Sequence, residues 1–129
     1  TNVEVEITCA STSNFLALQT GFPDVYLAAN TSGVHIGFVY STDNWTSYSG
    51  FTPAGNSAVS PYVQSAYNFY NMNENEIINF SLGLWASVPT ATTMKIRPYA
   101  QSGGGTYSFQ DNGASFTDVV SLTVMEVQG

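Results

Sequence analysis

The sequence predicts an all-β protein, in which two antiparallel sheets pack face to face as a sandwich with jelly-roll topology and about eight or nine strands. Apolar and polar residues alternate with a period of two in several segments, as on a strand with one buried face. Clusters of Gly, Pro, Asn, Asp and Ser separate these segments. No segment combines helical spacing of apolar residues with capping residues at its ends. We therefore expect very little helix.

The strands expected in the first half of the chain are short. Residues 3–9 alternate between apolar side chains and Glu4, Glu6 and Thr8, and Cys9 at their end is expected to be a small buried side chain. Three apolar runs follow, at 15–20, 25–29 and 34–40, with turn residues between them. The weakly patterned stretch 45–61 is the segment that we expect to be a functional loop.

The second half contains longer strand-like segments, at 62–72, 76–87, 92–101, 106–110 and 119–127. In the third of these, Met94 and Ile96 alternate with Lys95 and Arg97, so one face is apolar and the other is basic. Turn residues at 72–75, 87–90, 102–105 and 111–115 separate the segments. Because no repeat or linker divides the chain, residues 1–129 are expected to form a single domain.

The balance of charge restricts the partners of the protein. Nine acidic residues against two basic ones give a formal net charge of −7. Such a chain has no cationic surface to neutralise phosphates. We therefore expect neither nucleic acid nor a membrane among its partners.

Few residues are suited to catalysis or to metal binding. One His and one Cys exclude the usual tetrahedral zinc sites, and no nucleophile or phosphate-binding motif occurs. The carboxylate pairs Glu4/Glu6 and Glu74/Glu76 could act as acid and base, but alternation with apolar residues is more typical of a solvated face. Oxygen-rich segments at 71–76 and 110–112 could hold calcium, although Asn and Asp also dominate ordinary turns. We expect a protein that is not an enzyme, without catalytic residues, cofactor or metal.

Aromatic residues in the long loop permit two interpretations. Together with neighbouring polar groups they could stack on a sugar ring and bind its hydroxyls, or they could cover one end of the core or pack against another subunit. The second interpretation is favoured. The residues that would contact a glycan are Asp43, Asn44, Trp45, Tyr48 and Phe51.

The two cations and the last strand carry more specific expectations. Lys95 and Arg97 share a strand face with Tyr99, so we expect specific carboxylate partners for them. The segment 119–127 is partly apolar on both faces, which predicts a central strand whose outer face a second subunit covers. Glu126 near its end is expected to pair with Lys95 or Arg97, within a subunit or between subunits.

The segments SGGGTYSF, GASF and VVSLTVMEV carry a family resemblance. The chain resembles the trimeric jelly rolls related to tumour necrosis factor and the complement globular head, and SLTVMEV is similar to the C-termini of such domains in tailed-phage virion proteins. The resemblance implies aromatic and aliphatic subunit contacts near a threefold axis. With the two cations included, the expected interface residues are Tyr62, Tyr67, Phe69, Lys95, Arg97, Tyr99, Met125, Glu126 and Val127.

We therefore expect a non-enzymatic structural protein of the virion surface, outside the cell. It would be a homotrimeric capsid decoration or cement protein of a bacteriophage, bound to itself and to the major capsid protein or another virion protein. One alternative is a receptor-binding tail-fibre tip or lectin-like module that binds a host-surface glycan. A further alternative is an extracellular filament subunit, in which the strand Val3–Cys9 completes a neighbour's sheet.

Overall fold

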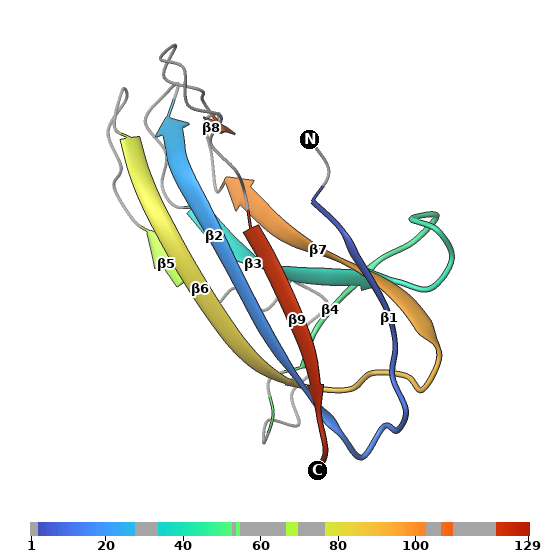
Figure 1. The fold of residues 1–129 in the computed structure, drawn as a ribbon. Helices are drawn as coiled ribbons and strands as arrows, with labels where there is room; N and C mark the ends of the chain where they lie inside the picture. The colour runs from blue at the N-terminus through green and yellow to red at the C-terminus, as the bar shows by residue number, and fades with distance from the viewer. Residues whose placement is uncertain are drawn as a thin grey trace.

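The computed structural model describes residues 3–27, 34–52, 54, 67–69, 77–102, 107–109 and 121–129, and side chains within the ranges 3–21, 37–52, 54, 81–99 and 121–129. These residues form two antiparallel sheets that lie against each other (Figure 1). The predicted all-β fold with two sheets is confirmed. The described residues include no helix, and hence none long and apolar enough to span a membrane.

The first sheet, sheet A, is built around the pairing of β7 with β3. Its described strands are β1 (Val5–Thr8), β7 (Thr93–Ser102), β3 (Val34–Ser41), β4 (Ser49–Gly50) and β5 (Tyr67–Phe69). β1 and β3 flank β7, whereas β4 and β5 pair with different parts of β3. The register of β1 with β7 places Glu6 directly opposite Lys95. The charged residues of these two strands therefore share the outer face.

The second sheet, sheet B, is centred on β2. Its described strands are β6 (Ile77–Ser87), β2 (Phe15–Leu27), β8 (Tyr107–Phe109) and β9 (Ser121–Val127). β6 pairs along one edge of β2, and β9 and β8 follow one another along the other edge. In Figure 1, β6, β2 and β9 run side by side in one layer. Backbone hydrogen bonds from Ala54 to Trp85 and from Ser87 to Thr52 connect the chain after β4 to β6.

β2 is one long strand where the sequence predicts two strands and a turn at 19–24. Pairing with β6 continues through this segment, with a shift of register between Phe22 and Val25. Pro23 lies within the shift. Proline has no N–H to donate to a ladder and is tolerated in a central strand at a bulge. The turn prediction was wrong because the Gly and Pro of this segment accompany a bulge.

The core lies between the sheets and takes side chains from both. Leu16, Leu18, Leu82 and Ala86 come from sheet B, and Phe38, Met94 and Ile96 come from sheet A; Cys9, Phe51 and Val88 complete the buried cluster. Met94 and Ile96 point inward, as their alternation with the two cations predicts. Cys9 is buried and has no disulfide, which confirms its prediction as a small core residue.

β9 is covered on one face only. Leu122 and Val124 pack against the core, whereas Ser121, Thr123 and Met125 are exposed on the outer face. Within the described residues β9 pairs with β2 alone, so it is an edge strand there. Within the described residues the prediction of a central strand was wrong, because no second strand lies beside β9 there.

Glu126 holds the end of β9 to the turn that precedes β2. Its carboxylate accepts hydrogen bonds from the backbone N–H of Ala10 at 2.9 and 3.0 Å, from Ser11 N at 3.4 Å and from Asn14 Nδ2 at 2.7 Å. The Asn14 side chain, in turn, accepts a bond from Gly129 N at 3.3 Å. These bonds, led by that from Asn14, lower the pKa of Glu126. Within one copy of the chain the predicted pairing of Glu126 with Lys95 or Arg97 was wrong, because both cations bind Glu4 and the amide groups of Ala10, Ser11 and Asn14 bind Glu126. The pairing between subunits stays a prediction.

Candidate functional site

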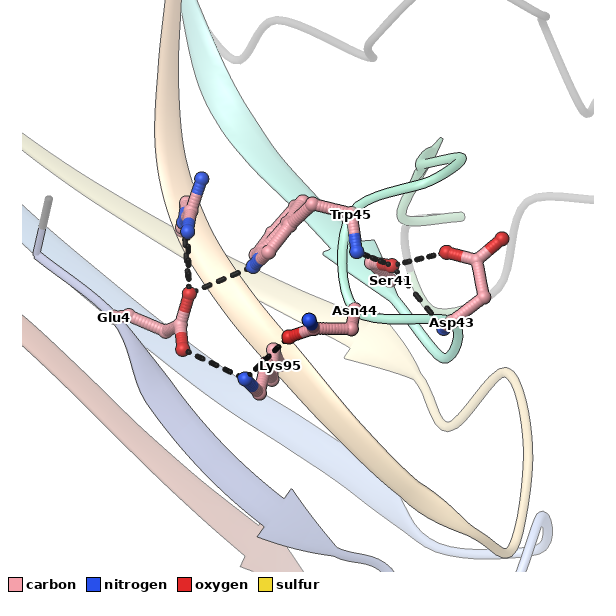
Figure 2. Close-up of polar contacts among 7 residues, drawn as sticks. Glu4, Ser41, Asp43, Asn44, Trp45 and Lys95 are labelled. Atoms are coloured by element: carbon pink, nitrogen blue, oxygen red, sulfur yellow. Dashed lines mark hydrogen bonds and ion pairs between the residues drawn. The ribbon is translucent and has the colours of Figure 1, made fainter.

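Most charged side chains of the described residues lie on the outer face of sheet A. The loop between β3 and β4, residues 42–48, folds over this face beside β7 and the residue before β1. Trp45 and Tyr48 from the loop contact Arg97 and Tyr99 of β7, respectively. The candidate site is therefore assembled from three segments far apart in sequence (Figure 2).

Glu4 is the centre of the candidate site. Its Oε2 lies 2.7 Å from Arg97 Nη2, and it accepts hydrogen bonds from Arg97 Nε at 2.9 Å and Trp45 Nε1 at 2.7 Å. Its Oε1 lies 3.6 Å from Lys95 Nζ. Figure 2 shows the carboxylate pointing between Trp45 and Lys95. Both cations of the chain thus have a specific carboxylate partner, as predicted, and that partner is Glu4.

The two cations also hold the loop. The Arg97 guanidinium carbon lies 4.0 Å from the centroid of the Trp45 ring, which is a cation–π contact. Lys95 Nζ donates a hydrogen bond of 2.8 Å to Asn44 Oδ1. Because each cation binds Glu4 and a loop residue, β7 connects the start of the chain to the loop.

The electrostatic environment keeps Glu4 ionised. Partial burial raises the pKa of Glu4, but hydrogen bonds from Trp45 and Arg97 and the positive charges of Arg97 and Lys95 lower it below its ordinary value overall. A carboxylate with a lowered pKa and oxygens already bound to donors is a weak base. Glu4 is therefore suited to fixing structure rather than to proton transfer.

A second carboxylate, Asp43, shapes the loop itself. Its oxygens accept hydrogen bonds from Ser47 Oγ at 2.6 Å, Ser47 N at 3.0 Å and Ser41 Oγ at 2.7 Å. The bonds from Ser47, followed by that from Ser41, lower the pKa of Asp43 to about 2. Ser41 is 3 % exposed, and its Oγ also accepts a bond from Trp45 N at 2.9 Å. The segment STDNWTS thus closes on itself through its own side chains.

Two successive loop residues have left-handed backbone conformations. Asn44 has a φ of 55° and Trp45 a φ of 68°. Asn tolerates this region, whereas a bulky residue such as Trp is strained there by about 1–2 kcal/mol. The bonds of Trp45 to Ser41 and Glu4 offset this strain. The indole is therefore held in one orientation over β7.

The residues predicted to contact a glycan are divided by the structure. Asp43, Asn44 and Tyr48 are exposed, and Trp45 is half-buried with its N–H bound to Glu4. Phe51 is 2 % exposed and packs on Tyr40 with ring centroids 5.0 Å apart. Phe51 is thus a core residue and was wrongly included in a surface contact set, since its side chain belongs to the buried cluster between the sheets.

The predicted interface residues do not form one patch in the described chain. Lys95, Arg97 and Tyr99 lie on the outer face of sheet A, whereas Met125 and Val127 lie on the outer face of sheet B. Tyr62 lies outside the described residues, and of Tyr67 and Phe69 only the backbone of β5 is described. The inclusion of all of them in a subunit interface stays a prediction.

Sequence reasoning missed the roles of Glu4, Ser41 and Ser47. Glu4 was read as a solvated carboxylate because the pairing of β1 with β7 cannot be read from alternation alone. One signal was available: Glu4 and Glu6 share a face, as do the only two cations, and opposite charges in register stabilise neighbouring strands. The spacing of Ser41, Asp43 and Ser47 is likewise a recognisable pattern for a side-chain-closed turn.

The described residues contain no gathering of three or more His, Cys, Asp or Glu side chains that could hold a metal ion. The segments 71–76 and 110–112, considered for calcium, lie outside the described residues. For His35 only the backbone of β3 is described.

What the candidate site does chemically is to fix an aromatic loop on a sheet by charge-assisted hydrogen bonds. Comparison with family models, curated proteins and solved structures finds no match to this chain.

The pKa of Asp43 predicts a loss of stability in acid. A carboxylate whose folded pKa is depressed stabilises the fold above its unfolded pKa of about 3.9, and this contribution is lost as the pH falls toward the folded value. We expect Asp43→Asn to melt below the wild type at pH 6 and the two melting temperatures to converge between about pH 4 and 2. Thermal melts followed by circular dichroism across this range measure the difference. Thr92→Ala, at an exposed position without a carboxylate, is the control, and its melting temperature should differ from that of the wild type by the same amount at every pH. A difference in melting temperature between Asp43→Asn and the wild type that stays constant with pH would contradict the prediction.

The geometry at Arg97 predicts that lysine cannot replace it. Lysine would keep the charge but lose the two-nitrogen contact with Glu4 and the flat stacking on Trp45. We expect Arg97→Lys to lower the free energy of unfolding by about 1–2 kcal/mol in urea titrations. The reverse exchange, Lys95→Arg, is the control and should cost less than about 0.5 kcal/mol, because Lys95 makes a longer and looser ion pair. An Arg97→Lys variant as stable as the wild type would show that only charge matters at this position.

Proposed function

We propose that this protein is a non-enzymatic structural protein of the virion surface, a capsid decoration protein that stabilises a phage shell by binding to it and to copies of itself. The observation that carries the proposal is the outer face of sheet B. There Trp85 is 47 % exposed and Met125 is 57 % exposed, on a face without charges in its described part. Exposed apolar residues on an uncharged face are typical of a protein–protein contact.

The candidate site supports the same function indirectly. Its charged groups are bound to one another and keep a loop in place, which suits a rigid building block. The jelly-roll topology and the homotrimer belong to this proposal, with the support of the resemblance to trimeric jelly rolls. Each association on a shell stabilises the folded, assembled state by mass action.

The proposal predicts that the chain copurifies with virus particles. Antibodies raised against the purified chain should detect it in the particle band of a density gradient of lysate from the producing culture. Particles made without the protein should release their nucleic acid at a lower temperature than complete particles, because the decorating contacts are missing. Detection of the chain only in the particle-free fractions would refute a role on the virion.

A second candidate function, glycan binding at a receptor-binding tip, has one specific observation in its favour. Tyr48 is 57 % exposed and lies beside Tyr99, with ring centroids 6.1 Å apart, on a loop held in a fixed conformation. Preorganised aromatic rings lose little entropy when a sugar stacks on them.

Tyr48→Ala tests the glycan proposal better than a change of Trp45, because Trp45 also holds Glu4. If this function is correct, the wild type binds defined glycans on an array and Tyr48→Ala loses at least tenfold in affinity. Trp85→Ala, an exposed aromatic residue on the opposite sheet, is the matched control and should bind as the wild type does. Binding unaffected by Tyr48→Ala, or absent from the wild type, would remove this candidate.

A further inference from the structure

The end of β9 lies beside the turn between β1 and β2 (Figure 1). We call residues 126–129 the strand end and residues 10–14 the receiving turn. Two side chains join these segments. The carboxylate of Glu126 accepts hydrogen bonds from amide donors of the turn, and Asn14 Oδ1 accepts a bond of 3.3 Å from Gly129 N. The contact is thus made by hydrogen bonds that a single carboxylate dominates.

The receiving turn keeps its shape through bonds of its own. Asn14 N donates to Ser11 O at 3.2 Å, and Ser13 N donates to Ser11 Oγ at 3.1 Å. Val88 N, after β6, donates to Asn14 O at 3.3 Å. None of these bonds involves the strand end. They can therefore hold the turn when the strand end leaves it.

The strand end fits closely against the receiving turn. A Cβ at Gly129 would overlap the carbonyl oxygen of Ser13 and come within 3.2 Å of the Phe15 ring. Only a residue without a side chain can lie this close to the backbone of the turn. Such a fit is lost as soon as the strand end moves, so the seated and the released positions are distinct.

β9 contributes less to the core than the strands around it. Its inward-facing Leu122 and Val124 are partly buried, whereas the fully buried cluster takes its members from other segments. Within the described residues β9 pairs with β2 alone. Segments with few buried apolar contacts open at a lower free energy than the whole fold. The strand end can therefore open while the two sheets stay packed.

The described surroundings of Glu126 carry no opposing or matching charge. Residues 10–21, which form the receiving turn and the part of β2 that pairs with β9, are all uncharged. Glu4 and Glu6 lie on the outer face of sheet A, where both cations of the chain bind Glu4. The titratable group beside the turn is the Cys9 thiol, whose pKa is raised by burial and, after that, by the charge of Glu126. Neutral amides therefore stabilise the Glu126 charge.

Protonation makes the same contact unfavourable. An ionised carboxyl accepts bonds on both oxygens, whereas a protonated one carries an O–H that is itself a donor. The N–H groups of Ala10 and Ser11 and the Asn14 amide are donors, so a proton on Glu126 would face them and the charge-assisted strength would be lost. The hydrogen bonds, led by that from Asn14, accordingly lower the pKa of Glu126.

We propose that Glu126 is an acid-sensitive latch on β9: as a carboxylate it holds the strand end on the receiving turn, and its protonation releases the strand end while the two sheets stay packed. This inference does not depend on the proposed virion role. The pKa of the seated carboxyl lies below its ordinary value of 4.5, so the stabilisation is fully present above that pH and is lost as the pH falls through the lower, seated value.

Hydrogen–deuterium exchange of the intact chain from about pH 6 to about pH 2 tests the latch, with rates corrected for the intrinsic dependence of exchange on pH. Peptides that cover residues 121–129 report on β9, and peptides that cover residues 81–87 report on β6. We expect the protection of the β9 peptides to fall about five- to tenfold relative to the β6 peptides, because charge-assisted bonds are lost. Protection of β9 that stays constant, or that falls together with that of β6, would overturn the latch.

Two variants assign the effect to the carboxylate. Glu126→Gln removes the charge and keeps the size of the side chain, so the strand end should be released already at about pH 6 and show no further change in acid. Asn14→Ala removes the shortest bond to the carboxylate and should move the midpoint of release to higher pH. A loss of β9 protection in Glu126→Gln that follows pH as in the wild type would mean that another group titrates, and the assignment would fall.

Glu6→Gln is the matched control, because it neutralises an exposed carboxylate of β1 outside the latch. Its β9 peptides should lose protection at the same pH as those of the wild type. The β6 peptides show for each variant that the sandwich is folded, and peptides of the loop 42–48 report separately on Asp43. A midpoint that moves as far in Glu6→Gln as in Asn14→Ala would show that overall charge, and not the latch, controls the strand end.

Discussion

Glu4 binds both cations of the chain and the indole N–H of Trp45 through one carboxylate. The start of β1, the middle of β7 and the loop after β3 are therefore held together at a single point of the outer face of sheet A. The hydrogen bond from the Trp45 indole to Glu4 helps to hold Trp45 in its left-handed conformation, together with the bond from Trp45 N to Ser41. An isolated exposed ion pair contributes little, whereas a network with several donors and a stacked ring holds its members in one geometry.

The two sheets of the molecule use their outer faces differently. The loop 42–48 lies on the outer face of sheet A, where Glu4 binds both cations of the chain. The outer face of sheet B has no charge among its described side chains and exposes Trp85 and Met125. A partner that approaches sheet A meets charged groups and a loop held by hydrogen bonds, whereas a partner that approaches the described part of sheet B meets uncharged side chains, some apolar and some polar. The fold thereby separates a face suited to self-stabilisation from one suited to association.

Alternation of residue types predicted much of the fold because it reports directly on burial. It placed Met94 and Ile96 inside and the cations outside, and it located the described strands except β4, which lies in the stretch 45–61 that was expected to be a loop. It failed where the answer depends on which strands become neighbours. The continuation of β2 through Pro23 requires β6 beside it, and the partners of Glu4 and Glu126 require the pairing of β1 with β7 and the turn at Ala10. Contacts between distant segments leave little trace in a local pattern.

The arrangement of β9 has a mechanical consequence. β9 pairs with β2 from Phe15 opposite Val127 to Gly21 opposite Ser121, and the hydrogen bonds between the strands run perpendicular to both. Tension along β9 therefore loads these bonds together in shear instead of opening them one at a time from an end. The attachment of Glu126 to Ala10 and Asn14 resists fraying at the same end of the strand. A chain pulled along this strand should thus yield abruptly at a high force.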